Sequence, residues 1–528
     1  MTERPNLADE NLPSGSRRNL LLDARTRPAI GRHGGEAGGA LVARNALWLV
    51  VGQVLTAALS FAVAAVLARH LGAEEYGVFY LAGTFVETAF TVVEFGQEYY
   101  IVRVVARQRE GLGDILGTGL AFRIAVALVI SPAVVAATRI FGYPDATRTA
   151  VSLMLAFYLL GSLANGFSVV FRGVERMDYE AAARVALKTL VAVAAVVAVA
   201  LGGGVNVVIE AQILGGAGAL VIYVVIAHRL RIARLRVHAR VAASILRGSA
   251  PFLLWTIVMT CDASVHAIML SKLAPGEVVG WYAAATRFSS VLIFPATILA
   301  AALYPTLSRL FVEQPESYRR FVQSALRAMF LLGALCAGGT LLFADDAVAL
   351  VYGQGAFGPA AATLRVLALY IFLDFVNITL GTAIMAANRQ TPFIYAKGLC
   401  ILLVISLNSL LIPLCQARVA NGSLGSAITA AAAEIVMLGA GLLLVPRGTL
   451  APALLRDLAR AAAATAVMAG VIHLLGHVFP GVGIALGVLT YVAVVVGLGG
   501  VRREDVALLR SAVRLRSRAV AAVAAGDP

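Results

Sequence analysis

The sequence predicts an all-α polytopic membrane protein with about fourteen transmembrane helices. Hydrophobic residues make up 60% of the chain, charged residues make up only 14%, and the mean hydropathy is +0.86. The apolar residues form runs of about 20, which is the length that a helix needs to cross a hydrocarbon core. A soluble domain cannot bury so much apolar surface, and the runs lack the alternation of strands in a membrane barrel. The chain is therefore expected to fold in lipid as a bundle of helices, which satisfy their own backbone polar groups.

The first two apolar runs form a hairpin that sets the pattern for the chain. Arg44 and Asn45 precede a run at 46–68, and a polar turn at 69–77 leads to a second run at 78–101. Basic residues beginning with Arg103 follow the second run. Each run can cross the membrane once, so the turn lies on one side and both basic ends lie on the other.

Further apolar runs of similar length predict the remaining helices. They lie near residues 118–139, 148–171, 184–201, 205–228, 250–271, 279–304, 324–344, 360–387, 394–415, 422–445, 458–478 and 481–500. Composition and charge divide the chain between and around these runs. The divisions are a disordered cytoplasmic tail at 1–40, an N-lobe at 41–230, a basic cytoplasmic linker at 231–248, a C-lobe at 249–446, two additional helices at 447–500 and a basic cytoplasmic tail at 501–528.

The basic residues indicate the orientation in the membrane. The chain has 43 Lys and Arg against 29 Asp and Glu, which gives a formal net charge of +14. Most of these basic residues, Lys188 and Lys397 among them, fall at alternate helix ends, on the side of the N-terminal tail. Segments rich in Lys and Arg stay in the cytoplasm, so both termini are expected to be cytoplasmic. The charge is thereby explained without a nucleic-acid partner.

An internal repeat relates the two lobes. A shift of 203 residues carries Arg44 onto Arg247 and Gly77 onto Gly280, with no gap between these positions. The shift spans an even number of helices, so the two copies cross the membrane in the same direction. Such parallel repeats are related by a pseudo-two-fold axis along the membrane normal. Two six-helix pseudo-symmetric lobes should therefore face each other, with a cleft between them and the two C-terminal helices outside the repeat.

At this point the sequence resembles a known family. The matching residues in the first half are Arg44-Asn45, Leu67, Arg69, Gly72, Tyr76-Gly77, Glu94-Phe95-Gly96 and Val102-Arg103, and those in the second half are Asp262, Gly280, Tyr282, Pro295, Tyr304-Pro305 and Ser308-Arg309. This pattern is similar to that of O-antigen, or Wzx-like, polysaccharide flippases of the multidrug/oligosaccharidyl-lipid/polysaccharide exporter superfamily. The resemblance extends over about residues 44–450.

The resemblance implies a function, a substrate and a location. Proteins of this type carry a polyprenyl-diphosphate-linked oligosaccharide across the bacterial cytoplasmic membrane by alternating access of two lobes. The implied partners are the lipid-linked glycan, membrane lipids, and a polysaccharide polymerase or glycosyltransferases. No cofactor, metal or catalytic residue is expected, and coupling to a H⁺ or Na⁺ gradient is left open. The chain also lacks the phosphate-binding loop of ATP-hydrolysing proteins.

Charged residues inside the predicted helices are the candidate cleft residues, because a charge at the bilayer centre costs about 3 kcal/mol on insertion scales. Glu87, Glu94 and Glu98 are spaced by seven and four residues, so they share one helix face. They form a wet cavity wall with a proton or cation site, or else Glu94 and Glu98 lie near the inner surface and pair with Arg103 or Arg123.

The second lobe supplies the complementary candidates. Asp262 and His266 lie one turn apart, as a proton relay or as a buried pair that joins helices. The guanidinium of Arg287 suits the oxygens of a diphosphate, or else pairs with Asp262. Asp374 and Asn165 are further cleft candidates, for which an interhelical hydrogen bond is the simpler role. An interhelical hydrogen bond is also the simpler role for Asn377, Glu434 and Ser168.

Three other functions are weighed against a glycan flippase. A cation-coupled multidrug exporter of the same fold, MATE-like, would need a more aromatic and acidic cleft. A membrane glycosyltransferase or polymerase would need a sizeable extramembrane loop with paired acids, which the chain lacks. A scaffold would recruit synthesis enzymes through the tails without transport.

Overall fold

The computed structural model describes residues 35–107, 111–232, 235–353, 355–475 and 480–500. The chain divides into a small unit, Met1–Arg44 with Val513–Pro528, and a large unit, Asn45–Ala512, which holds the membrane helices. Residues 1–34 of the predicted N-terminal tail and the whole predicted tail at 501–528 lie outside the described residues. Residues 35–40 already belong to the first helix.

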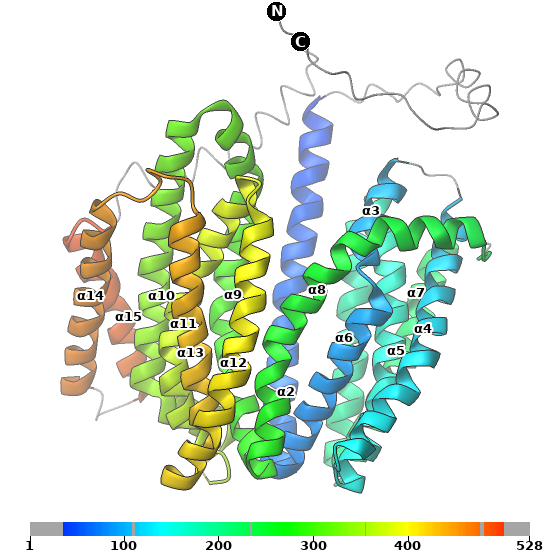
Figure 1. The fold of residues 1–528 in the computed structure, drawn as a ribbon, viewed down its shortest axis with the longest axis horizontal. Helices are drawn as coiled ribbons and strands as arrows, with labels where there is room; N and C mark the ends of the chain where they lie inside the picture. The colour runs from blue at the N-terminus through cyan, green and yellow to red at the C-terminus, as the bar shows by residue number, and fades with distance from the viewer. Residues whose placement is uncertain (1–34, 108–110, 233–234, 354, 476–479, 501–528) are drawn as a thin grey trace, which may run out of the picture. The chain divides into compact units, whose positions relative to one another are not determined.

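The described residues are almost entirely helical, as the apolar runs predicted (Figure 1). The helices of the N-lobe are α2 (Gly35–Glu94), α3 (Gln97–Arg107), α4 (Leu112–Ile140), α5 (Asp145–Gly173), α6 (Met177–Ala200) and α7 (Val205–Arg229). Those of the C-lobe are α8 (Ala239–Leu273), α9 (Gly276–Glu313), α10 (Pro315–Tyr352), α11 (Ala360–Ala386), α12 (Gln390–Val419) and α13 (Gly422–Leu444). The last two helices are α14 (Ala453–Leu475) and α15 (Pro480–Gly497).

The predicted hairpin is formed by the two arms of α2. Non-helical backbone angles at Gly72 (φ 72°, ψ 179°) separate the arms, and the blue ribbon reverses its direction there (Figure 1). Glycine adopts this backbone conformation without the steric penalty of a Cβ. A second break lies between α2 and α3, where Phe95 (φ 52°) and Gly96 (φ 66°) both have positive φ.

Twelve helical segments of the described chain are long and apolar enough to cross a membrane. The first of them includes the second arm of α2, and α15 adds a shorter apolar helix at Gly483–Gly497. The chain is therefore a multi-pass membrane protein with the predicted helix order. One boundary differs from expectation, since α8 begins at Ala239, within the segment predicted as a linker at 231–248. The orientation of the termini stays a prediction.

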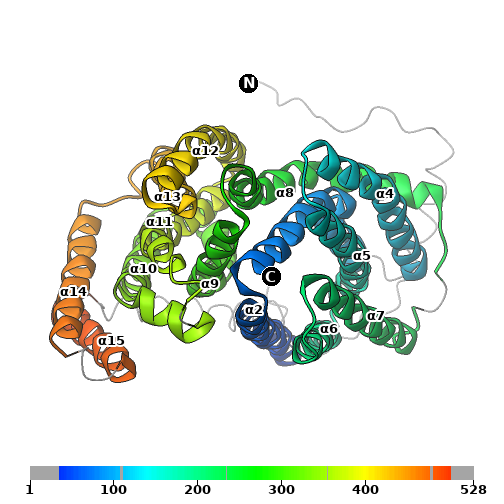
Figure 2. The same cartoon turned by 90° about the horizontal axis from the view of Figure 1, so that it is seen from below.

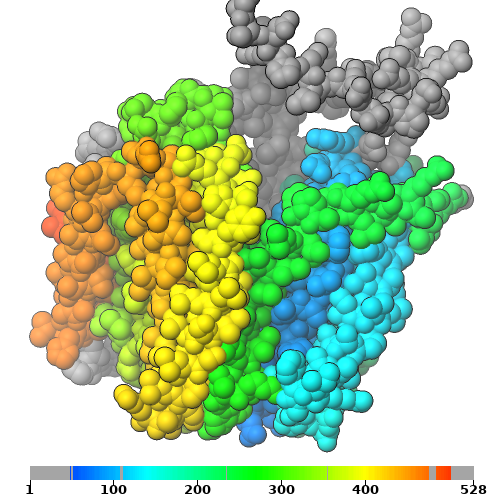
Figure 3. All heavy atoms as spheres, in the orientation of Figure 1, coloured from blue at the N-terminus to red at the C-terminus, as the bar shows by residue number. Residues whose placement is uncertain are grey.

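Each lobe packs mainly on itself. In the C-lobe α11 lies against α9, α10 and α13, and α12 lies against α13, whereas in the N-lobe α5 and α6 pack on α7. Helix α8 contacts both lobes, so α12, α8 and α4 lie side by side on one face of the large unit (Figure 3). Helix α14 packs on α10, outside the repeat (Figure 2).

The lobes also touch at the end of the unit that contains Gly72, called the Gly72 end below. There a Cβ added to Gly77 would lie 2.5 Å from the carbonyl oxygen of Gly276, and one added to Gly280 would lie 1.9 Å from that of Ala73. The shift of 203 residues carries Ala73 onto Gly276 and Gly77 onto Gly280. The two contacts are therefore reciprocal, as a two-fold axis between the lobes requires.

Basic side chains reinforce this contact. Arg69 Nε donates a hydrogen bond to the carbonyl oxygen of Val351 at 2.8 Å, from the N-lobe to the C-lobe. Lys272 Nζ donates to the carbonyl oxygen of Phe141 at 2.6 Å, in the opposite direction. The sequence shift carries Arg69 onto Lys272, so these bonds also reflect the repeat. The lobes are thus held together at the Gly72 end, which the charge pattern predicts to be the outer side.

Candidate functional site

A polar cavity of about 480 Å³ lies between the lobes. It begins one turn beyond Gly77 and is lined by residues of α2, α8, α9, α11 and α13. Four of the predicted site residues are among the lining residues, namely Glu87, Asp262, His266 and Arg287. They come from three helices and from both lobes, so the tertiary structure brings together residues that are as far as 200 positions apart in the chain.

A buried ion-pair cluster forms the C-lobe wall of this cavity. Lys397 Nζ lies 2.8 Å from Asp262 Oδ2 and 3.5 Å from Glu434 Oε1. Asn377 Nδ2 donates to Glu434 Oε2 at 2.6 Å. The sequence suggested an interhelical hydrogen bond for each of these residues without naming its partner, and the structure pairs them. Asp374 interacts electrostatically with Glu434 and Lys397 but is not a lining residue. One cation thus lies among three carboxylates contributed by three helices.

Asp262 binds Lys397 and not Arg287, so the structural pair considered for Asp262 and Arg287 is wrong. His266 has a different partner as well. Its Nδ1 lies 3.2 Å from Asn408 Nδ2, and its ring lies 6.0 Å from that of Tyr282. Asp262 and His266 therefore belong to separate contacts, although both face the cavity.

Arg287 occupies the boundary between two cavities. A second cavity of about 200 Å³ lies in the N-lobe and shares Tyr80, Thr84, Glu87 and Arg287 with the first. Among the described residues, the buried Arg287 Nε has no hydrogen-bond partner. Phenol groups surround the guanidinium, with Tyr76 its main electrostatic neighbour and Tyr80 the next. Because a buried guanidinium N–H without a partner is costly, this group is available to an anionic ligand.

Lys188 of α6 also lines the second cavity. The sequence counted both Lys188 and Lys397 with the basic residues of cytoplasmic segments, whereas both lie inside helices, where Lys188 lines a cavity and Lys397 forms the ion pair with Asp262. The sequence does contain a signal that could have identified these two residues, because each is a single lysine several residues inside an apolar run. Such a residue is a candidate for function by the same cost argument that singled out the acids.

Two predicted cleft residues, Glu94 and Asn165, lie outside the lining of both cavities. Asn165 Nδ2 donates to Glu94 Oε1 at 3.2 Å, and Arg123 Nη1 lies 3.6 Å from the same oxygen. The Arg123–Glu94 pair was one of the alternatives from the sequence. Glu98 instead forms an ion pair with Arg172.

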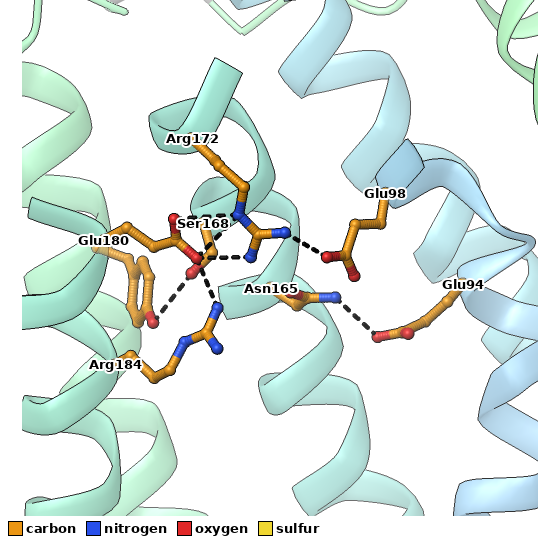
Figure 4. A network of polar contacts seen from close by, with 8 residues as sticks. Glu94, Glu98, Asn165, Ser168, Arg172, Glu180 and Arg184 are labelled. Atoms are coloured by element: carbon orange, nitrogen blue, oxygen red, sulfur yellow. Dashed lines mark hydrogen bonds and ion pairs between the residues drawn. The ribbon is translucent and has the colours of Figure 1, made fainter. Parts of the chain in front are cut away.

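The network continues towards α6, as Figure 4 shows. Arg172 Nη2 and Arg184 Nη2 each lie 2.6 Å from Oε1 of Glu180, whose side chain is fully buried. Ser168 Oγ donates to the hydroxyl of Tyr223 at 3.2 Å. The network joins α3, α5, α6 and α7 beside the break at Phe95. Its charges are mutually compensated, which is consistent with a structural role.

No group of three or more His, Cys, Asp or Glu that could hold a metal ion occurs within the described ranges. The charged residues of the cavity instead suit an anionic, polar ligand at Arg287 and a mobile cation at the acidic cluster. Neither arrangement resembles a catalytic triad or a paired-acid site.

Comparison with known proteins identifies the family of this chain. The model of the family described as "Polysaccharide biosynthesis protein" matches residues 42–311. A relative from Haloferax volcanii, the probable low-salt glycan biosynthesis flippase Agl15, is 23% identical over 379 residues, which cover 70% of this chain and 78% of that protein.

Solved structures show the same fold. The lipid II flippase MurJ in an inward closed conformation has a TM-score of 0.66 at 13% identity, with 87% of this chain and 99% of that chain covered. An inward-facing multidrug resistance MATE transporter of the MOP superfamily has a TM-score of 0.61 at 18% identity, with 76% and 97% covered. The family match includes both sides of the central cavity, from Glu87 to Arg287, and spans just over half of the chain. The chain therefore belongs to the polysaccharide biosynthesis protein family.

Proposed function

We propose that this protein is a flippase that carries a lipid-linked oligosaccharide across the cytoplasmic membrane of a bacterium by alternating access. The observation that carries the proposal is the cavity between the lobes, in which Arg287 holds an unpartnered N–H. The family match and the flippase relative support the substrate class. A cavity of this kind is suited to transport and not to catalysis.

The charge of the site fits a diphosphate. A guanidinium presents parallel N–H groups that bind phosphate oxygens in a bidentate manner, and burial strengthens such bonds. The hydroxyls of Tyr80 and Thr84 and the carboxylate of Glu87 line the same space and suit the hydroxyls of a sugar. The glycan head group would occupy the cavity, while its lipid tail remains among bilayer lipids.

The acidic cluster around Lys397 is proposed as the coupling element. Protonation of Asp262 or Glu434, or binding of Na⁺ between them, would release Lys397 from one of its two partners. The cluster joins α8, α12 and α13, so this change would act on the helices of the cavity wall. Coupling to H⁺ or Na⁺ thus needs no cofactor.

Reconstituted vesicles provide the test. The full chain is inserted into vesicles that carry a fluorescent polyprenyl-diphosphate oligosaccharide, and exposure of the glycan in the opposite leaflet is measured with an impermeant glycosidase. We expect wild-type protein to accelerate the exchange and Arg287→Ala to reduce the rate at least tenfold, because one charge-assisted contact is lost.

Arg365→Ala is the matched control, because this exposed arginine pairs with Asp345 and does not line either cavity. It should leave the rate within about twofold of wild type. A wild-type protein that fails to move the lipid-linked glycan would refute the proposal. An imposed H⁺ or Na⁺ gradient, applied in the same vesicles, should accelerate wild type but not Asp262→Asn.

The MATE-like alternative is tested with the same preparation. The fold is compatible with it, since a MATE transporter is among the similar structures. The cationic site at Arg287 favours an anionic substrate over the cationic compounds expected for a multidrug exporter. Efflux of a cationic dye by wild type that persists in Arg287→Ala would support the alternative. We further propose that a polysaccharide polymerase or glycosyltransferases act on the same glycan as partners.

A further inference from the structure

An apolar groove of about 540 Å³ runs between α2 and α6. Trp48, Val51 and Leu55 line it from α2, and Val185 and Leu190 line it from α6. Thr189 is the one polar side chain among its lining residues. Both helices are membrane spans, so the natural occupant of this groove is a hydrocarbon chain.

The groove and the second cavity are lined by neighbouring residues of the same two helices. Helix α2 contributes Leu55 to the groove and Leu59 to the cavity, one turn apart, and α6 contributes Leu190 to the groove and Val191 to the cavity. Figure 2 shows α2 beside α6 in the view along the helices. A Cβ on Gly52 would lie 3.2 Å from that of Ala181, which confirms that the helices touch at the groove.

The second cavity, beside the groove, is cationic. Lys188 makes no ion pair or hydrogen bond within the described part of the chain, and Arg287 and Glu87 act on it at longer range. Arg287 lies in the same cavity with its Nε unpartnered, as described above. Two cations therefore face one carboxylate, which leaves a net positive site next to an apolar groove. This is a receptor for an amphiphile with an anionic head group.

The charge of the second cavity favours a lipid with a multiply charged anionic head group over the zwitterionic lipids of a bilayer. Lys188 follows the start of α6 at Met177 by eleven residues, which corresponds to about 16 Å along the helix. A diphosphate would meet both Lys188 and Arg287 in this cavity, whereas a zwitterionic head group brings a positive charge of its own.

We propose that the α2–α6 groove holds the polyprenyl chain of the lipid-linked substrate while Lys188, together with Arg287, binds its diphosphate. This inference rests on the proposed function and adds the path by which the head group reaches the central cavity. The head group would pass from Lys188 to Arg287 and then into the central cavity, because the two cavities share the Glu87 and Arg287 side chains.

The test uses the full chain in phosphatidylcholine nanodiscs and a long-chain polyprenyl diphosphate with a diazirine in its chain. After irradiation, mass spectrometry should find the label on α2 and α6 around Val51, Leu55 and Ala182. Ala182→Trp fills the groove from an exposed position and should reduce labelling at least fivefold, whereas Val193→Trp, on the same helix but outside the groove, should leave it unchanged.

The charge is tested by competition. Unlabelled polyprenyl diphosphate should displace the probe from wild type, and Lys188→Gln should weaken this competitor about tenfold, as expected for one lost charge-assisted contact. Competition by the uncharged polyprenol should not change in this variant, and Lys188→Arg should restore competition by the diphosphate. A structural lysine would affect both competitors alike, and that result would overturn the role of Lys188.

Two further outcomes would overturn the groove assignment. One is equal labelling of the groove by a diazirine phosphatidylcholine probe that polyprenyl diphosphate does not displace, which would identify a bilayer lipid site. The other is labelling of the polyprenyl probe elsewhere while wild type still moves the lipid-linked oligosaccharide in vesicles. The second outcome leaves the proposed function intact. Displaceable groove labelling without any translocation would instead refute the function and retain the site.

Discussion

Substitution of Gly280 by alanine should force the two lobes apart at the Gly72 end. The added Cβ would lie 1.9 Å from the carbonyl oxygen of Ala73, whereas van der Waals contact begins at about 3.4 Å. Both atoms belong to backbone held in helices, so a side-chain rotation cannot relieve the overlap. The lobes must separate by about 1.5 Å at this point, which is the difference between the two distances.

Such a separation would break the hydrogen bonds that close this end. The Arg69–Val351 bond of 2.8 Å and the Lys272–Phe141 bond of 2.6 Å both exceed hydrogen-bonding range when lengthened by 1.5 Å. Each contributes about 1 kcal/mol once its exposure is taken into account. Their loss should therefore shift the equilibrium by about 2 kcal/mol, or about 30-fold, away from the conformation closed at the Gly72 end.

Distance measurements between spin labels at exposed helix ends can detect this shift. Cysteines at Leu201 of the N-lobe and Val419 of the C-lobe are labelled in a chain whose native cysteines are replaced by alanine. Gly280→Ala should increase the population of long distances, whereas Gly339→Ala, whose Cβ would meet nothing within 4 Å, should not. A folded Gly280→Ala protein with the wild-type distance distribution would refute the reasoning.

Two further predictions concern buried charges, and a third concerns the contact at the Gly72 end. Lys397→Gln leaves two acids without their cation and should lower the free energy of unfolding by about 3–5 kcal/mol, whereas the double change with Asp262→Asn should recover part of this loss in thermal unfolding. Glu180→Gln removes the anion that binds Arg172 and should cost about 2–4 kcal/mol by the same assay, and an unchanged melting temperature would contradict a structural role. Arg69→Ala removes one of the bonds at the Gly72 end, at about 1 kcal/mol, and should increase modification of a cysteine at Leu201 by an impermeant reagent by up to about fivefold, less than Gly280→Ala does; a larger increase than in Gly280→Ala would contradict the division of this contact among several bonds.

The class of protein and the order of its helices can be predicted from the amino-acid sequence. Runs of about 20 apolar residues can be read directly, because the thickness of the bilayer sets their length and leaves few alternatives. The repeat was also visible, since Gly77 and Gly280 recur at a fixed spacing within polar turns. Their spacing predicted a two-fold axis, and the tertiary structure gave the physical reason for these glycines, which is the close approach of two backbones.

Only the tertiary structure decided which charges act together. Helical periodicity places Glu87 and Glu94 on one face, yet Glu87 lines the cavity while Glu94 binds Asn165 and Arg123. Lys397 lies near a helix end, where the positive-inside rule explains a lysine without any partner. Its ion pairs with α8 and α13 depend on how three helices pack, and the local sequence carries no record of that packing. Partner choice among buried charges is a property of the assembled bundle, because each charge binds whichever opposite charge the neighbouring helices bring within reach.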